Sequence, residues 1–150
     1  MALGDFFPEA VRRQKAEAAL TPGTVLYLEV RFPQVTKAKY LVLAAIEEPD
    51  ILIFIVNSEI SELVRRQDHL LKCQVALTAA QNTFLQHDSQ LACHEVFRLK
   101  REMVLSELTS DLSRIRGSVS ASTRAQILSA VKFTKTIEPR LQRLIITNFE

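Results

Sequence analysis

The sequence predicts an α+β protein in which a small antiparallel β-barrel of about five strands lies between an N-terminal helix and two or three C-terminal helices. Three observations support this fold class. Between residues 24 and 99, short runs rich in β-branched and aromatic residues alternate with turn residues. These runs lie too close together for the crossover helices that a parallel sheet requires. After residue 100, hydrophobic residues recur at the three- and four-residue spacing of helices.

The first twenty residues read as a short helix with Pro8 in its first turn, ended by Thr21-Pro22-Gly23. Five strands are expected, over Val25–Phe32, Lys39–Ala45, Ile51–Asn57, Cys73–Leu77 and Leu91–Leu99. The third of these is continuously apolar, which is typical of a strand buried on both faces. A short helix is expected over Ser58–Arg66, with Ser58 or Ser61 as its cap.

Three helices are expected after Lys100. The first carries a hydrophobic stripe at four-, four- and three-residue spacing from Val104 to Ile115 and ends at Gly117, where a positive φ is commonly needed. The second begins at Ser120 or Ser122. The third opens at Glu138-Pro139.

Composition indicates an ordinary globular chain of 150 residues, 47% of them hydrophobic and 24% charged. We expect one domain over 1–150, with the barrel core in 22–100 and the helical part in 101–150. The longest apolar run, Ile51–Val56, is far below the roughly 18 residues of a membrane span, so no membrane partner is expected. The N-terminus has no apolar stretch of signal-peptide length, and we therefore expect free thiols at the two cysteines and a cytoplasmic location.

Charge is distributed unevenly, although the net charge is only +2. Residues 41–71 hold six acids and two bases, a net of −4, whereas residues 112–150 hold seven bases and two acids, a net of +5. Such asymmetry can orient a nucleic acid or an acidic partner. An ordinary solvated helical face is the alternative interpretation.

Several kinds of chemistry are excluded by residues that the chain lacks. With only three glycines, it has no glycine-rich phosphate loop and no dinucleotide fingerprint. The spacing of Cys73, His87, Cys93 and His94 matches no standard zinc pattern, and adjacent residues of a strand point to opposite faces. We therefore expect neither a metal nor a cofactor.

Two predicted strand ends carry the first candidate site. Lys39 enters the second strand, and Asn57-Ser58 ends the third. In a small antiparallel barrel the start of one strand lies beside the end of its neighbour, so Lys39 and Ser58 are expected to meet at one rim. An ammonium and a hydroxyl there would suit a phosphate. The alternative is that Ser58 caps a helix and Lys39 is a solvated strand end.

The second candidate is the sequence His87-Asp88-Ser89, which comes just before the last strand. A histidine beside a carboxylate can be held in one tautomer and act as an acid or base. The alternative interpretation is that Asp88 and Ser89 are turn or capping residues and that His87 is exposed.

The order of these elements resembles the MazF/PemK toxins, which are SH3-like-barrel endoribonucleases of toxin–antitoxin systems. The resemblance covers about residues 22–133. Its pieces are Pro22–Leu28, Phe32–Leu43, Ile55–Ser58, Asp88–Leu99 and Arg114–Ser120. The family's Arg-Pro pair is Lys39-Tyr40 in this chain, which keeps a positive charge but not the two-pronged guanidinium.

This resemblance implies a metal-independent endoribonuclease that cleaves single-stranded RNA through attack of a 2′-hydroxyl on the adjacent phosphorus. It also implies a homodimer that is inhibited by an antitoxin protein. The expected catalytic residues are Lys39, Ser58 and His87. The expected RNA contacts are Arg31, Lys37, Asn57, Asp88 and Ser89. The alternative is a module that has lost catalysis and binds RNA or a protein partner through its basic helical tail.

Overall fold

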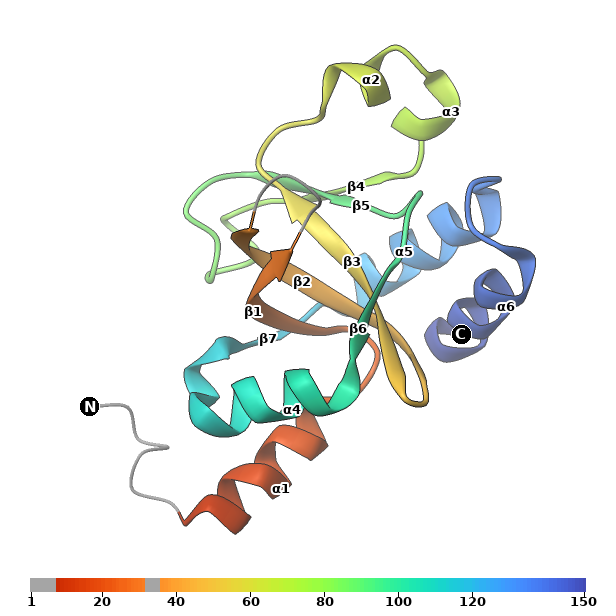
Figure 1. The fold of residues 1–150 in the computed structure, drawn as a ribbon. Coiled ribbons are helices and arrows are strands. Elements are labelled where there is room, and N and C mark those ends of the chain that lie inside the picture. The colour runs from red at the N-terminus through yellow and green to blue at the C-terminus, as the bar shows by residue number, and fades with distance from the viewer. Residues whose placement is uncertain (1–7, 32–35) are drawn as a thin grey trace.

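Helices cover both faces of one antiparallel sheet, as shown in Figure 1. The computed structural model describes residues 8–31 and 36–150. The strands are β1 (Thr24–Arg31), β2 (Thr36–Glu47), β3 (Asp50–Asn57), β4 (Gln74–Leu77), β5 (Ser89–Ala92), β6 (Phe97–Lys100) and β7 (Ile115–Ser118). The helices are α1 (Glu9–Ala19), α2 (Glu62–Arg65), α3 (Asp68–Leu71), α4 (Arg101–Ser110), α5 (Ala121–Phe133) and α6 (Pro139–Phe149), with a short 3₁₀ helix, η2 (Leu112–Arg114), after α4. The predicted α+β class, with a helix before the sheet and helices after it, is confirmed.

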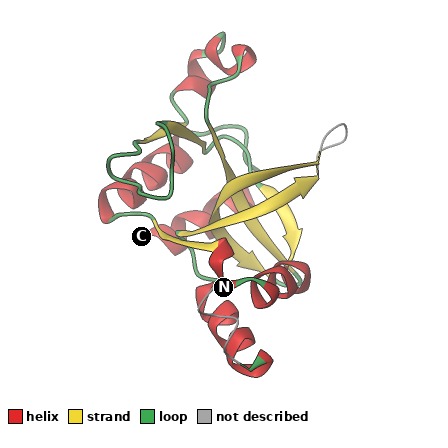
Figure 2. Cartoon of the chain, turned by 90° about the vertical axis from the view of Figure 1, so that its left-hand side faces the viewer, coloured by secondary structure: helices red, strands yellow, loops and turns green. Residues whose placement is uncertain are grey.

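Over the described ranges the sheet has seven strands, in the order β4-β5-β3-β2-β1-β7, and β6 pairs with the N-terminal half of β3. Register shifts between Val25 and Leu26 and between Leu43 and Ala45 interrupt the ladders of the long strands. Such irregularities bend strands and increase their twist. The sheet curls strongly into a half-barrel, visible in Figure 2. Within the described residues no pairing joins the edge strands β4 and β7.

Two hydrophobic cores lie on the two faces of this sheet. On one face α5 and α6 contribute Ile127 and Ile145, both fully buried. On the other face α1 and α4 contribute Ala16 and Leu105, also fully buried. Because β3 lies between the two cores, the six residues Ile51–Val56 are all buried, as the continuous apolar run predicted.

The segment Ile115–Ser118 forms β7, so the prediction of a helix that runs on to Gly117 is wrong. The helix α4 ends at Ser110 because the backbone of Asp111 is extended and its Oδ1 accepts a hydrogen bond from the Ser113 amide at 3.0 Å. The chain then pairs with β1. The free hydrogen-bonding edge of β1 decides this conformation, and hydrophobic spacing within the segment does not reveal it.

The single strand expected over Leu91–Leu99 is divided into β5 and β6. Both pair with the same strand, since Leu91 faces Val56 near the end of β3 and Phe97 faces Ile53 in its first half. The residues between them leave the ladder. The strand β3 thus pairs with two short strands along one of its edges.

The helix expected over Ser58–Arg66 is the single turn α2, and its cap is Ser61. The Ser61 Oγ accepts a hydrogen bond from the Val64 amide at 3.3 Å. Ser58 lies outside this cap and lines the pocket described below. The turn α3 follows directly and was not predicted.

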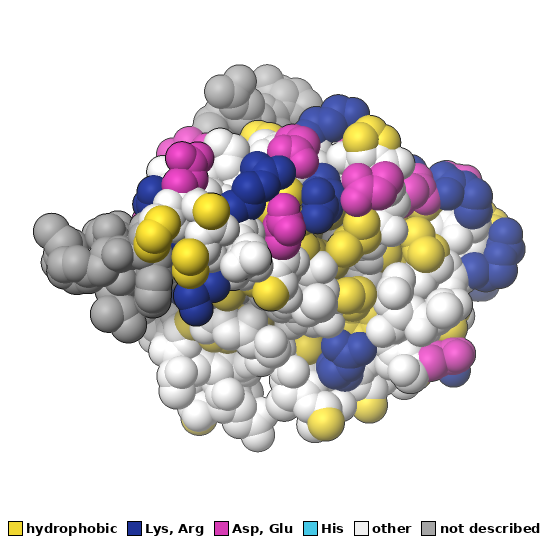
Figure 3. Space-filling model, turned by 90° about the horizontal axis from the view of Figure 1, so that it is seen from below, with side chains coloured by type: hydrophobic (Ala, Val, Ile, Leu, Met, Phe, Trp, Pro, Cys, Tyr) yellow, Lys and Arg dark blue, Asp and Glu magenta, His cyan; other side chains and the backbone are white. Residues whose placement is uncertain are grey.

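Two bases of the basic C-terminal segment, Arg124 and Arg140, bind other parts of the chain. The Arg124 guanidinium donates to the carbonyl oxygens of Pro22 and Asn148 at 2.9 and 3.0 Å, and Arg140 pairs with Glu47. Figure 3 shows basic and acidic side chains interspersed on the face seen from below. In the described ranges, no helix has the length and apolar character needed to cross a membrane.

Candidate functional site

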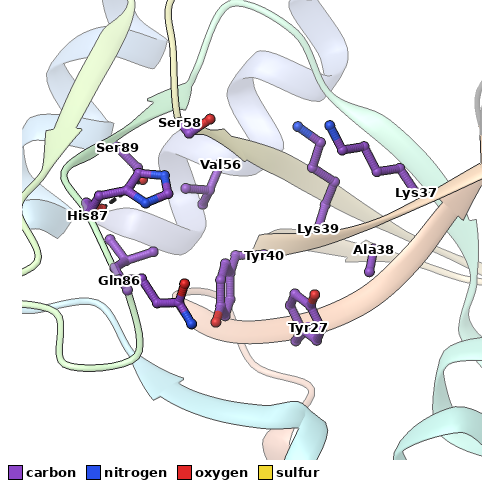
Figure 4. Close-up of a pocket in the computed structure, with 11 residues that line it drawn as sticks. Tyr27, Lys37, Ala38, Lys39, Tyr40, Val56, Ser58, Gln86, His87 and Ser89 are labelled. Atoms are coloured by element: carbon purple, nitrogen blue, oxygen red, sulfur yellow. Dashed lines mark hydrogen bonds between the residues drawn. The ribbon is translucent and has the colours of Figure 1, made fainter.

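A pocket of about 250 Å³ lies where β2 runs past the C-terminal end of β3, as shown in Figure 4. Its walls come from β1, β2, the end of β3 and the segment that leads into β5. Five of the eight predicted site residues line it: Lys37, Lys39, Ser58, His87 and Ser89. Strand alternation and antiparallel pairing thus bring together residues that are up to 52 positions apart (89 − 37).

Lys37 and Lys39 lie near the start of β2. In the described part of the chain, β2 pairs with β1 along this stretch, whereas β3 ends at Asn57. The Lys39 Nζ donates to the Asn57 Oδ1 at 3.2 Å. Partial burial lowers the pKa of the Lys39 ammonium, and the nearby charge of Lys37 lowers it further. Both ammonium groups rise on one side of β2 in Figure 4, which concentrates positive charge at this strand end.

Two aromatic side chains line the pocket from the side of β2 opposite the lysines, as Figure 4 shows. Tyr27 of β1 and Tyr40 of β2 are directly paired, and their ring centroids are 4.7 Å apart. The Tyr40 ring lies 5.3 Å from the Phe84 ring, and its hydroxyl donates to the Phe84 carbonyl oxygen at 2.9 Å. On the other side, the Arg116 guanidinium lies 5.1 Å from the Tyr27 ring centroid. The contacts between Tyr40 and Phe84 hold the segment before β5 against the sheet.

His87 reaches the pocket from that segment. The Asp88 Oδ1 accepts a hydrogen bond from the Ala79 amide at 2.8 Å, which closes the base of the loop. The Ser89 Oγ donates to the His87 carbonyl oxygen at 3.1 Å. The His87 side chain is exposed, and its imidazole has no hydrogen-bond partner among the described residues. Its ring nitrogens are therefore accessible to a ligand in the pocket.

The other predicted site residues have different positions. Asn57 holds Lys39 and lines a second pocket, considered below. Asp88 does not line the first pocket, and its carboxylate accepts a hydrogen bond from the loop backbone, at the Ala79 amide. Arg31 ends β1, and its side chain lies outside the described residues.

The structure offers no metal-binding cluster within the residues that it describes, where no group of three or more His, Cys, Asp or Glu side chains is arranged to hold an ion. The two cysteines are free and buried. Burial raises the pKa of both the Cys73 and the Cys93 thiols, which disfavours the nucleophilic thiolate.

Sequence reasoning missed Tyr27, Tyr40 and Gln86, which also line the first pocket. One signal was present. The chain has two tyrosines, and they fall in consecutive predicted strands joined by a short loop, where an antiparallel pairing can place them opposite each other. No local pattern marked Gln86.

Comparison of the chain with models of protein families found no match, and comparison with curated protein sequences found none either.

Proposed function

We propose that the first pocket, near the start of β2, binds a short segment of single-stranded RNA. The observation that carries this proposal is that Lys37 and Lys39 line one pocket together with the paired rings of Tyr27 and Tyr40. Lysine side chains bind phosphate groups as point charges, and aromatic rings give bases an apolar surface. A duplex would keep its bases stacked and out of reach, whereas a single strand can present them to the pocket.

Binding is tested by fluorescence anisotropy with a labelled single-stranded RNA, in chelator, over a series of salt concentrations. We expect affinity to fall steeply as salt rises, because counterions compete with the lysines. Lys39→Ala should weaken binding to all sequences and reduce the slope of log K against log salt by roughly 0.7–1. Lys132→Ala is the matched control, since Lys132 is an exposed lysine on α5 outside the pocket. Equal loss in both variants, or salt-independent binding, would contradict the proposal.

A second candidate function is metal-independent cleavage of that RNA. It is favoured by His87 and Ser58, which line the same pocket as Lys39. In this reaction the 2′-oxygen attacks the adjacent phosphorus and the bond to the 5′-oxygen breaks. His87 would accept the proton of the 2′-hydroxyl, and the 5′-oxygen would leave with a proton from water. Lys39 would stabilise the negative charge of the phosphorane, and Ser58 would bind one of its oxygens.

Cleavage is tested on an end-labelled RNA incubated with the protein in chelator, with the products resolved on a gel. A 2′,3′-cyclic phosphate end is expected. His87→Ala should slow cleavage by about 10²-fold or more while RNA affinity changes little. Cleavage by His87→Ala at the unchanged rate would remove His87 from the reaction, and binding without cleavage by the unmodified protein would leave the RNA-binding function alone.

The nuclease candidate includes the MazF/PemK-like features that the sequence led us to expect. These are an SH3-like barrel, of which the half-barrel would be an open form, a homodimer and an antitoxin partner. Light scattering at micromolar concentration tests the dimer directly. A mass equal to that of one chain would contradict it.

A further inference from the structure

A second pocket, of about 290 Å³, lies beside the first at the end of β3, where the chain leaves for α2. Its apolar walls include Ile55 and Val64, and its polar groups include Asn57, His94 and Glu95. The two pockets share Lys39 in their linings. A strand of RNA whose phosphate contacts Lys39 can therefore place one nucleotide in each pocket.

The polar groups of this second pocket have assignable hydrogen-bonding roles. The Gln74 Nε2 lies 3.0 Å from the Leu70 carbonyl oxygen and 2.9 Å from the His94 Nδ1. Because a carbonyl oxygen only accepts, the Gln74 nitrogen must be the donor, and its second hydrogen is directed at His94. His94 Nδ1 is then the acceptor, and the proton of the neutral ring is on Nε2.

The neutral form of His94 is favoured by its surroundings. The side chain is 15% exposed, and burial lowers the pKa of the imidazole. Glu95 opposes this shift, whereas His69 adds to it. At neutral pH the ring therefore offers an N–H donor at Nε2.

An acceptor lies close to that donor. The Glu95 Oε2 is 3.9 Å from the His94 Nε2, which is too long for a direct hydrogen bond, so both groups remain able to bind a ligand. The pair thus presents one N–H donor beside a carboxylate. A ligand that complements this pair has a planar edge with one acceptor next to two donors, because a carboxylate can accept two parallel N–H bonds.

Among the four RNA bases, guanine has such an edge. Its O6 is an acceptor, and its N1–H and N2–H groups are two adjacent donors. Adenine, cytosine and uracil present a single donor beside an acceptor on their pairing edges. The apolar walls suit the faces of the ring, and the volume approaches the roughly 300 Å³ at which small-molecule pockets begin.

We propose that the second pocket binds a guanine base of the RNA strand whose phosphate contacts Lys39, with His94 Nε2 donating to O6 and Glu95 accepting from N1–H and N2–H. This proposal rests on the RNA-binding function proposed above, because that function supplies the RNA strand that carries the guanine. It adds a base preference that the first pocket does not explain.

The preference is tested with labelled oligouridine RNAs that contain one guanine, adenine or inosine at the same position. A side chain that makes two hydrogen bonds to one base favours that base over the others by about ten-fold or more. We therefore expect the guanine RNA to bind about ten-fold more tightly than the adenine RNA. Inosine lacks the N2 amino group, and its RNA should lose most of this advantage. Glu95→Gln should remove the preference and leave binding to plain oligouridine in place. Glu62→Gln removes an exposed carboxylate outside the pocket and should retain the preference.

A second measurement separates this inference from the proposed function. Guanosine 5′-monophosphate is titrated into the protein while the imidazole NMR resonances of His94 are followed, with adenosine 5′-monophosphate as the control. Shifts of the His94 resonances with the guanine nucleotide alone support the guanine site even if no RNA binds to the first pocket. RNA binding without guanine preference, together with unmoved His94 resonances, overturns the guanine site and leaves the proposed function standing. If neither RNA nor the mononucleotide binds, both proposals are wrong.

Discussion

Removing the Arg124 guanidinium should destabilise the whole fold, although Arg124 belongs to a segment whose bases first suggested a partner-binding surface. The side chain projects from α5, is only partly exposed, and joins distant parts of the chain. Its Nη1 donates to the Pro22 carbonyl oxygen before β1, and its Nη2 donates to the Asn148 carbonyl oxygen near the end of α6. The guanidinium also lies 4.7 Å from the centroid of the Phe149 ring.

The expected cost of Arg124→Ala follows from these three contacts. Hydrogen bonds from a charged donor are worth roughly 1.5–3 kcal/mol each, and the partial exposure of this side chain places both at the lower end. The cation–π contact adds about 0.5–1 kcal/mol. The sum predicts a loss of about 3.5–4 kcal/mol in the free energy of unfolding. Arg124→Lys keeps the charge but cannot make both bonds with one ammonium in the same geometry, and we expect about half that loss.

Urea denaturation followed by circular dichroism measures these values. The control is Arg143→Ala, which removes an exposed guanidinium of α6 and should change stability by less than about 0.5 kcal/mol. A loss below about 1 kcal/mol for Arg124→Ala, or an equal loss in the control, would refute the argument. In that case Arg124 would be available to a partner after all.

Three further predictions follow from individual contacts. Gly23 has a φ of +96°, and a Cβ there would lie 2.6 Å from the Arg124 Nη1, so Gly23→Ala should cost at least about 1–2 kcal/mol by thermal denaturation. Its effect should be less than additive with that of Arg124→Ala, and full additivity would show that the two do not interact. Tyr40→Phe removes the hydrogen bond to the Phe84 carbonyl and should cost about 1 kcal/mol in urea denaturation, whereas Tyr27→Phe, whose hydroxyl has no partner among the described residues, should cost less. Because the pKa of Lys39 is lowered, its cation is lost at a lower pH than that of an ordinary lysine, and affinity for a 2′-O-methyl RNA should fall accordingly as pH rises. Lys39→Arg should keep that affinity at high pH, and an identical pH profile in both proteins would show that Lys39 does not bind the RNA.

The candidate site was partly predictable. The rule that one strand begins beside the end of its neighbour placed Lys39 and Ser58 at the same rim, and both line the first pocket. His87 joins them because Tyr40 binds the Phe84 carbonyl and holds the preceding loop on the sheet. That contact spans 44 positions, and nothing in the local sequence around His87 indicates it. The pairing of His94 with Gln74, 20 positions away, was equally hidden.

The local sequence by itself predicts those helices and strands whose hydrophobic spacing and turn residues suit the positions that they take in the fold. These include the helix after Pro8, the apolar strand Ile51–Asn57 and the helices that begin after Ser120 and Glu138. Tertiary structure decided the elements that exist through long-range pairing. Ile115 continues the helical spacing of the residues before it, but Ile115–Ser118 forms a strand, because its backbone groups find partners on the edge of β1, some 90 positions earlier (115 − 26 = 89). The backbone groups at the edge of a strand are the same whatever the side chains are. Hydrogen bonding to a distant strand therefore cannot be predicted from the local sequence pattern.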